Sequence, residues 1–301
     1  MANSYSFMAM TNSQGSVSSS SAPASAPASD SDTRFLDRGT GRIAYDVAGT
    51  GPLIIGVPGM GDLRSTFRHL TPVLVAAGYR VATMDLRGQG DSDTTFDSLD
   101  DPAAASDIVA LATYLGEPAM VMGISMGAAA AVIAAAGHPE TIRGLVLMGP
   151  FVRDLPSSAL QRMVMRAVMA GPWARRAWLA YLPKFYPTRR GEDFLEHKER
   201  IAQALARPGY TRAFRAVTRT SHAPSEAVLD QVHTSVLVVM GTKDPDFPDQ
   251  QAEAAMIAER LRGRYEMITG AGHYPQAEFP ELTTPLVLDF ARRLDGGPAD
   301  A

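Results

Sequence analysis

Short apolar runs alternate with segments of helical spacing from residue 35 to near the C-terminus. The runs with strand character are Gly41–Val47, Leu53–Val57, Arg80–Asp85, Ala119–Gly123, Arg143–Met148, Ser235–Met240 and Tyr265–Ile268. Apolar residues recur at helical spacing in Ser65–Ala77, Ala103–Leu115, Met126–Ala136, Gln250–Leu261 and Leu282–Leu294. Continuously apolar strands are buried on both faces, and helices between them are crossovers of parallel strands. The alternation therefore predicts an α/β fold, a mostly parallel sheet with helices on both faces.

Residues 151–230 interrupt this alternation. They contain no clear strand, and prolines at 172, 183, 187 and 208 divide them into short helices. They carry 14 Lys and Arg against 7 Asp and Glu, whereas the remainder carries 14 against 25. We expect residues 151–230 to form a cationic, all-helical cap inserted into an acidic core made of residues 34–150 and 231–296.

The two ends of the chain are expected to be disordered. Residues 1–33 are rich in Ser, Ala and Pro and have too little apolar mass to offset the entropy of ordering. They lack both a basic residue before Arg34 and a continuous apolar run, so we do not expect a signal peptide. The expected location is therefore the cytoplasm. Residues 297–301 are treated as a disordered C-terminus.

Composition excludes several classes of chemistry. The chain has 0 cysteines, which removes disulfides, thiolate metal sites and cysteine nucleophiles. No apolar stretch is long enough for stable membrane insertion. The arginine pairs Arg175–Arg176 and Arg189–Arg190 are separated by an apolar run, so we expect no nucleic-acid partner. A small-molecule substrate is the expected partner, and the oligomeric state is left open.

The sequence Gly123-Ile124-Ser125-Met126-Gly127 follows one predicted strand and begins a helix. A serine at such a sharp turn adopts a strained backbone, and small neighbours let the turn pass close to adjacent elements. The helix N-terminus also points backbone N–H groups at the place where a negative oxygen would form. We therefore expect Ser125 to be a catalytic nucleophile.

A serine nucleophile needs a neighbouring base, and His273 is the expected one. It lies in a glycine-rich loop after a late strand, in Gly270-Ala271-Gly272-His273. His138 ends a helix and is interpreted as structural, and His197 and His233 as surface residues. His222 closes the inserted segment and is kept as a possible substrate contact.

The base needs a carboxylate to orient its ring. Asp244 and Asp246 follow the strand Ser235–Met240, and Asp154 follows Arg143–Met148. Asp244 is favoured over Asp246 because it lies nearer the strand end. The order Ser125, Asp244, His273 also suits this architecture.

An oxyanion hole requires two backbone donors. Val57-Pro58-Gly59-Met60-Gly61 follows a strand, and its glycines allow close approach of the backbone to a substrate. The predicted donors are the N–H groups of Met60 and Met126, with Gly59 at the substrate.

These motifs resemble those of the α/β-hydrolase superfamily over about residues 35–296. Asp85-Leu86-Arg87-Gly88-Gln89-Gly90-Asp91-Ser92 resembles the family's D-x-R-G-x-G-x-S segment, and Glu278-x-Pro280-Glu281 is similar too. One departure is Pro58-Gly59, where many members have His-Gly. The resemblance implies an eight-stranded, mostly parallel sheet, a helical cap over the active site at residues 151–230, and catalysis without a cofactor or metal.

The chemistry implied is hydrolysis of a carboxylic ester, thioester or lactone through an acyl-enzyme on Ser125. An apolar substrate would lie under a cap that contributes Trp173 and Trp178. Carbon–carbon bond hydrolysis of vinylogous diketone acids is a second possibility, with cap arginines such as Arg153, Arg162 or Arg166 holding the carboxylate. A non-catalytic ligand receptor that signals through the cap is a third.

Overall fold

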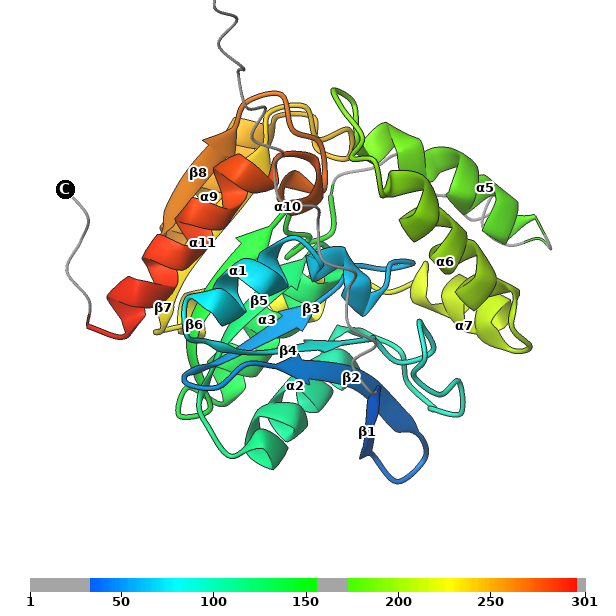
Figure 1. Ribbon diagram of the computed structural model, residues 1–301, viewed down its shortest axis with the longest axis horizontal. Helices are drawn as coiled ribbons and strands as arrows, with labels where there is room; N and C mark the ends of the chain where they lie inside the picture. Colours follow the sequence, from blue (N-terminus) through cyan, green and yellow to red (C-terminus); the bar gives the residue numbers. More distant parts are fainter. Residues whose placement is uncertain (1–32, 156–170, 172, 297–301) are drawn as a thin grey trace, which may run out of the picture. The chain divides into compact units, whose positions relative to one another are not determined.

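The computed structural model describes residues 33–155, 171 and 173–296. Their centre is an eight-stranded sheet with the order β1-β2-β4-β3-β5-β6-β7-β8 (Figure 1). The strands are β1 (Arg34–Asp37), β2 (Arg42–Ala48), β3 (Leu53–Val57), β4 (Arg80–Met84), β5 (Ala119–Ile124), β6 (Ile142–Met148), β7 (Ser235–Gly241) and β8 (Arg264–Ile268). β1 and β2 pair in the antiparallel sense, and every pairing from β4 to β8 is parallel.

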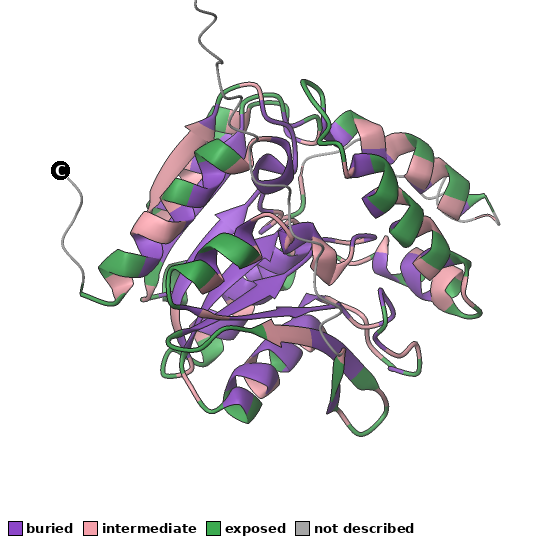
Figure 2. Cartoon of the chain, viewed as in Figure 1, coloured by how far each residue is buried: buried purple, intermediate pink, exposed green. Residues whose placement is uncertain are grey.

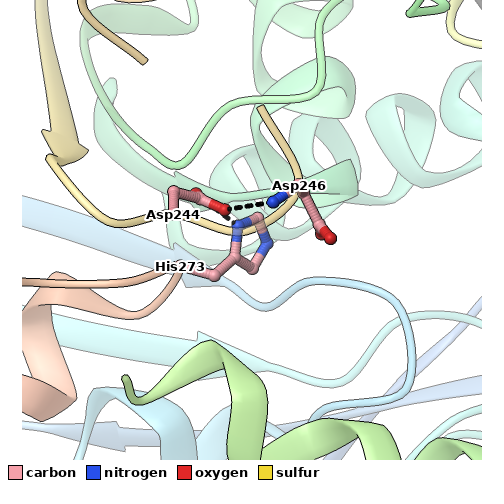
Figure 3. Close-up of side chains that lie close together, drawn as sticks. All are labelled: Asp244, Asp246 and His273. Atoms are coloured by element: carbon pink, nitrogen blue, oxygen red, sulfur yellow. Dashed lines mark hydrogen bonds and ion pairs between the residues drawn. The ribbon is translucent and has the colours of Figure 1, made fainter. Parts of the chain in front are cut away.

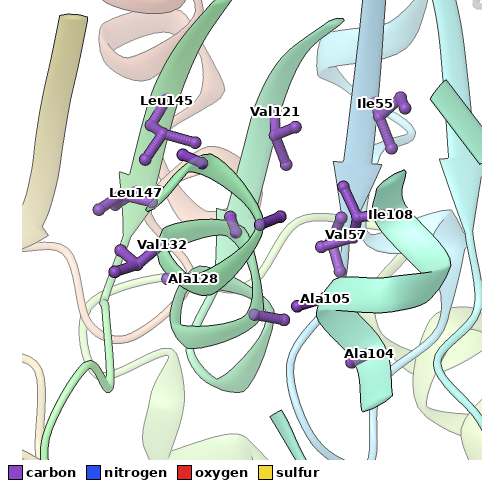
Figure 4. Packing of buried hydrophobic residues seen from close by; sticks show 14 of the residues in the cluster. Ile55, Val57, Ala104, Ala105, Ile108, Val121, Ala128, Val132, Leu145 and Leu147 are labelled. Carbon is purple, nitrogen blue, oxygen red and sulfur yellow. The ribbon is translucent and has the colours of Figure 1, made fainter. Parts of the chain in front are cut away.

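Helices cover both faces of the sheet. One face packs against α2 (Asp101–Leu115), α3 (Met126–Gly137) and α9 (Gln250–Arg260), and the other against α1 (Leu70–Ala76) and α11 (Pro280–Leu294). Successive strand residues point to opposite faces, so Ile55 joins the first cluster and Ile54 the second. Figure 4 shows Val121, Leu145 and Ile55 facing α2 and α3. Strands β3 to β7 are buried almost throughout, whereas the edge strands β1 and β8 are partly exposed, and the outer faces of the helices are exposed (Figure 2).

The sequence sets both ends of α2, the crossover helix that leads into β5. The Asp100 carboxylate accepts a hydrogen bond of 3.0 Å from Ala103 N at the start of α2, and Gly116, at φ 82°, ends that helix. The chain then enters β5, which pairs with β3 on one side and β6 on the other. The strand order changes direction at β3, and ligands bind at such a point in open α/β sheets.

The described part of residues 151–230 contains only helical elements. These are α5 (Ala174–Tyr181), η2 (Leu182–Phe185), α6 (Phe194–Ala206), α7 (Tyr210–Val217), α8 (Ala223–Glu226) and η3 (Leu229–Gln231). α5, α6 and α7 pack against one another and are separate from the helices on the sheet (Figure 1). We call residues 151–230 the insertion, because they lie between β6 and β7.

The α/β prediction and its seven strands are confirmed, with three differences of detail. The sheet has an additional edge strand, β1, which the four-residue stretch Arg34–Asp37 was too short to indicate. The predicted helix Ser65–Ala77 is divided into η1 (Arg64–Phe67) and α1, since Pro72 has no N–H to donate and fits only the first turn of a helix. A short helix, α10 (Pro275–Glu278), also follows the histidine loop.

Candidate functional site

Ser125 lies at a strained turn between β5 and α3. Its φ and ψ are 53° and −121°, in a region that non-glycine residues rarely adopt. Ser125 N donates to Met148 O at 3.0 Å, and Ala128 N donates to Ser125 O at 3.0 Å. The backbone on both sides of the turn is therefore fixed, and the strain is maintained by its surroundings.

The two glycines of the motif are required by close backbone contacts. A Cβ on Gly127 would lie 2.4 Å from Val57 O, and one on Gly123 would lie 2.6 Å from Gly127 O. Glycine at these positions lets α3 begin directly against the loop that follows β3. This contact brings Met60 and Ser125 to the same cavity.

His273 and Asp244 form a buried pair beside this turn. His273 Nδ1 lies 2.7 Å from Asp244 Oδ2, and the two side chains are 2% and 0% exposed (Figure 3). His273 N donates to Phe185 O at 3.1 Å, so the histidine loop is also held by the insertion. Burial disfavours the charged imidazole, but the neighbouring carboxylates of Asp244 and Asp246 outweigh it, and the pKa of His273 lies above its ordinary value.

The base and the nucleophile are not joined by a hydrogen bond in this structure. Ser125 and His273 line the same cavity, but among the described residues no hydrogen bond joins Ser125 Oγ to the His273 ring. Catalytic hydrogen bonds are often long before substrate binds. The structure therefore brings together Ser125, His273 and Asp244, with the serine–histidine contact still open.

The predicted oxyanion donors also lie at this place. Met60 and Met126 both line the cavity beside Ser125. Within the described part of the chain, neither backbone N–H donates a hydrogen bond outside the helix ladder, and Met126 is the first residue of α3. A Cβ on Gly59 would lie 2.9 Å from Ser125 Cβ, so Gly59 is in direct contact with the serine.

The cavity has a volume of about 420 Å³, within the range of small-molecule sites. Its described walls are mainly apolar and come from the core and the insertion: Met60, Ser125, Met126, Phe151, Ala177, Trp178, Tyr181, Phe185, Val217, Thr218, Thr220, His222, Asp246, His273 and Tyr274. A larger hollow of about 620 Å³ lies between residues 94–102 and α7, and it contains none of Ser125, Asp244 and His273. We place the candidate site in the smaller cavity because Ser125 and His273 line it.

Trp178 and Trp173 have different positions. Trp178 lines the cavity and donates from Nε1 to Gly61 O at 2.9 Å, which joins α5 to the loop after β3. The prediction that Trp173 contacts substrate is corrected, since its side chain is 54% exposed and lies outside the described cavity wall. The two tryptophans are five positions apart, which places them about 140° apart around a helix of 3.6 residues per turn.

The competing carboxylates have other partners. Asp246 accepts from Tyr181 OH at 2.9 Å, and its N–H donates to Asp244 Oδ1 at 3.0 Å, so it orients Asp244 from the side (Figure 3). Burial raises the pKa of Asp246, and the nearby Asp244 raises it further. Asp154 binds Ser221 Oγ and His222 N instead of His273.

Asp244, Asp246 and His273 could in principle hold a metal ion, because one ligand atom of each lies within 4.8 Å of the others. However, Nδ1 of His273 and Oδ2 of Asp244 are already joined by their hydrogen bond. A metal bound through these two atoms would replace the hydrogen bond that orients the ring. The expectation of a metal-free site therefore remains a prediction.

The interpretation of His197 as a surface residue is wrong. Its side chain is 3% exposed, and Nε2 lies 2.7 Å from Asp62 Oδ1. Helix α6 buries one side, on which His197 lies with Phe194 and Ile201, three or four residues away. That spacing was visible in the sequence, whereas the partner Asp62 was not.

Phe151 is a site residue that the sequence analysis did not identify. Its ring centroid lies 5.8 Å from those of both His222 and His273, and it lines the cavity. Its place directly after β6 was the available signal, because residues at the carboxyl ends of parallel strands gather at one edge of the sheet.

The remaining motifs hold the loops around the site. The Gln89 side-chain carbonyl accepts from Gly61 N, which ties the segment Asp85–Ser92 to the loop after β3. Glu278 is 1% exposed; its Oε2 accepts from Gly272 N at 2.7 Å, and its Oε1 from Thr188 N at 2.8 Å. It thus joins the histidine loop to the insertion.

Of the arginines proposed to bind a substrate carboxylate, Arg153 is described, and it lies outside the described cavity wall. Arg153 forms an ion pair with Glu253, at 2.9 Å and 2.5 Å. Arg162 and Arg166 lie outside the described residues. The described cavity wall contains no lysine or arginine.

An open α/β sheet with a serine at a strained strand-to-helix turn and a buried Asp–His pair beside it defines a class of hydrolytic proteins. Comparison with known proteins agrees. Residues 54–285 match the Alpha/beta hydrolase family. The chain is 30% identical over 252 residues to a pimeloyl-[acyl-carrier protein] methyl ester esterase of Neisseria meningitidis serogroup B, covering 80% of this chain and 92% of that protein. The chain belongs to the alpha/beta hydrolase family and is a hydrolase.

Solved structures share the fold. A bromoperoxidase from Bacillus anthracis superimposes with a TM-score of 0.75 at 18% identity, covering 86% of this chain and 99% of that one. An esterase from Exiguobacterium antarcticum has a TM-score of 0.73 at 18% identity, covering 84% and 96%. Within the described residues, no helix is long and apolar enough to cross a membrane.

Proposed function

We propose that this protein is a serine hydrolase that cleaves an uncharged carboxylic ester, thioester or lactone. The observation that carries the proposal is the meeting of Ser125, the His273–Asp244 pair and the free N–H groups of Met60 and Met126 around one apolar cavity. The Neisseria relative supports an ester substrate, since its name describes a methyl ester esterase.

In the proposed mechanism Ser125 Oγ attacks the carbonyl carbon while His273 Nε2 takes the hydroxyl proton. Asp244 holds the Nδ1–H tautomer and stabilises the imidazolium that forms. The N–H groups of Met60 and Met126 stabilise the tetrahedral oxyanion. His273 then gives its proton to the leaving group, and a water molecule activated by the same ring releases the acid and regenerates Ser125.

The insertion is proposed to act as a cap. Its residues Ala177, Trp178, Tyr181 and Phe185 line the cavity together with Met60 and Met126 of the core. An apolar lining of this kind fits the carbon chain of a substrate and limits the access of water to the acyl-enzyme. With residues 151–230 as the cap, residues 34–150 and 231–296 form the proposed core.

The test is hydrolysis of p-nitrophenyl esters of graded chain length by the full chain and by Ser125→Ala. We expect Ser125→Ala to lower kcat by at least about 10³-fold, since serine nucleophiles contribute this much or more. Ser235→Ala, at an exposed position, is the matched control and should retain wild-type rates. Near-full activity of Ser125→Ala would remove the nucleophile assignment.

The same panel, with a dienone acid added to it, separates the two other possibilities. Turnover of a dienone acid without turnover of any ester would indicate carbon–carbon bond hydrolysis, which no described cavity residue favours. Tight retention of a ligand without turnover of any compound would indicate a receptor.

A further inference from the structure

A second histidine in the cavity wall is oriented by its own buried carboxylate. His222 Nδ1 lies 2.7 Å from Asp101 Oδ2. Asp101, the first residue of α2, is 0% exposed, whereas the His222 side chain is 17% exposed and lines the cavity that contains Ser125. The site therefore has two imidazoles, each held through Nδ1, and the proposed mechanism uses only one of them.

The segment that carries His222 is held within the insertion as well. Asp154 accepts from His222 N at 2.8 Å and from Ser221 Oγ at 2.5 Å, so the backbone before α8 is tied to the residues after β6. The Phe151 ring lies 5.8 Å from the His222 ring and 5.8 Å from the His273 ring. His222 is thus held in place beside the triad without being part of it.

The hydrogen bond to Asp101 determines which nitrogen of the His222 ring can accept a hydrogen bond from a ligand. In a neutral imidazole, an Nδ1–H that donates to a carboxylate leaves Nε2 with a lone pair, which is a hydrogen-bond acceptor. Among the described residues, the one hydrogen bond of the His222 ring is this Nδ1 contact. Nε2 is therefore the acceptor of this ring that remains available, and His222 lines the cavity.

The described wall around His222 disfavours anionic ligands. It contains no lysine or arginine that could pair with a carboxylate, and Asp246 would repel one. A hydroxyl or an amide N–H, by contrast, carries no charge and can donate to Nε2.

We propose that His222, positioned by Asp101, is a specificity-determining residue that accepts a hydrogen bond from a hydroxyl or amide N–H on an otherwise apolar ester. This inference rests on the proposed function, which it deepens by naming the substrate class. Asp101 is a positioning residue, because it acts only through the orientation and tautomer of His222.

The experiment compares p-nitrophenyl esters that carry a hydroxyl at successive chain carbons with their methoxy counterparts. A methoxy group can accept a hydrogen bond but cannot donate one. The kcat/KM of the hydroxyl ester divided by that of its methoxy counterpart therefore reports hydrogen-bond donation by the substrate. At the matching carbon we expect the wild-type ratio to be about 5-fold, the value of one net hydrogen bond.

The deciding variant is His222→Asn. The asparagine amide nitrogen can replace Nδ1 against Asp101, but no atom remains at the position of Nε2, so the ratio should fall to about one. His233→Asn, the same change at an exposed histidine, should keep the wild-type ratio. A wild-type ratio near one at every carbon, or a ratio that survives in His222→Asn, would overturn the inference while leaving Ser125 as nucleophile.

Two measurements keep the inference testable on its own. In ¹⁵N NMR spectra, His222 should show a protonated Nδ1 and an unprotonated Nε2. Asp101→Asn should abolish this tautomer preference. If Asp101 had only a structural role, the tautomer of His222 would not depend on it. If no ester is hydrolysed, binding of hydroxylated and methoxylated methyl ketones to Ser125→Ala is measured by calorimetry. Preference for the hydroxyl that His222→Asn removes supports the inference; equal affinity, or binding of neither ketone, overturns it.

Discussion

The His197 imidazole and the Asp62 carboxylate form a buried pair, with Nε2 2.7 Å from Oδ1. Asp62 follows the Met60–Gly61 loop, and His197 lies on α6 of the insertion. Ser65 Oγ lies 3.3 Å from the other ring nitrogen, so both nitrogens of His197 have partners in the core. The pair joins the insertion to the loop that carries one predicted oxyanion donor.

Replacing His197 by Ala should destabilise the protein strongly. The substitution leaves the Asp62 carboxylate buried without its partner, which typically costs about 3–5 kcal/mol. Chemical denaturation should show a lower midpoint for His197→Ala. His233→Ala, at an exposed position, should change stability by no more than about 0.5 kcal/mol. An unchanged midpoint for His197→Ala would show that the pair contributes nothing.

The stabilisation by this pair should depend on pH. Burial alone would raise the pKa of Asp62, but the charge and hydrogen bond of His197 outweigh it and lower the pKa. A carboxyl whose pKa is lowered on folding stabilises the protein above its unfolded value of about 3.9, and this is lost as pH falls through the folded value. The difference between wild type and His197→Ala should therefore shrink in acid.

Asp244→Asn should reduce kcat far more than Asp246→Asn. An asparagine at position 244 can donate to Nδ1 and so favours the wrong tautomer of His273, an effect of about 10⁴-fold in a serine protease. Asp246 touches Asp244 only through its own N–H, which the substitution retains. Steady-state kinetics on one p-nitrophenyl ester decides the matter; a larger loss in Asp246→Asn would reverse the assignment of the two carboxylates.

The acid limb of kcat/KM should lie above the ordinary histidine pKa of about 6.5. His273 must be neutral to accept a proton, and the nearby carboxylates raise its pKa against the effect of burial, so activity should rise with pH through that higher value. Asp246→Asn removes one of these charges and should move the limb to lower pH. Asp97→Asn, at an exposed position, should leave it unchanged.

Two glycines of the same helix should respond oppositely to alanine. A Cβ on Gly127 would lie 2.4 Å from Val57 O and 2.5 Å from Pro58 O, so the loop of Met60 must shift. We expect Gly127→Ala to lower both Tm and kcat. A Cβ on Gly137 would meet nothing within 4 Å, and alanine there should raise stability by up to about 1 kcal/mol. Equal behaviour of the two variants would contradict the close approach at the turn.

Local patterns in the sequence predicted most of the sheet and the position of Ser125. Hydrophobic periodicity and turn chemistry act over a few residues, so Gly123–Gly127 could be read as a strand-to-helix turn without knowing what surrounds it. His273 and Asp244 were likewise indicated by their places after strands, because parallel strands end at one edge of the sheet.

The tertiary structure decided which distant side chains meet. It placed Trp178 rather than Trp173 at the cavity, which depends on the face that α5 turns to the core. It paired His197 with Asp62, 135 residues away, and His222 with Asp101, 121 residues away. Such pairs leave no periodic signal in the chain, because each partner is set by how whole elements pack. The sequence by itself thus determined the strands, the helices and the turn that carries Ser125, and packing alone determined the environment in which that serine lies.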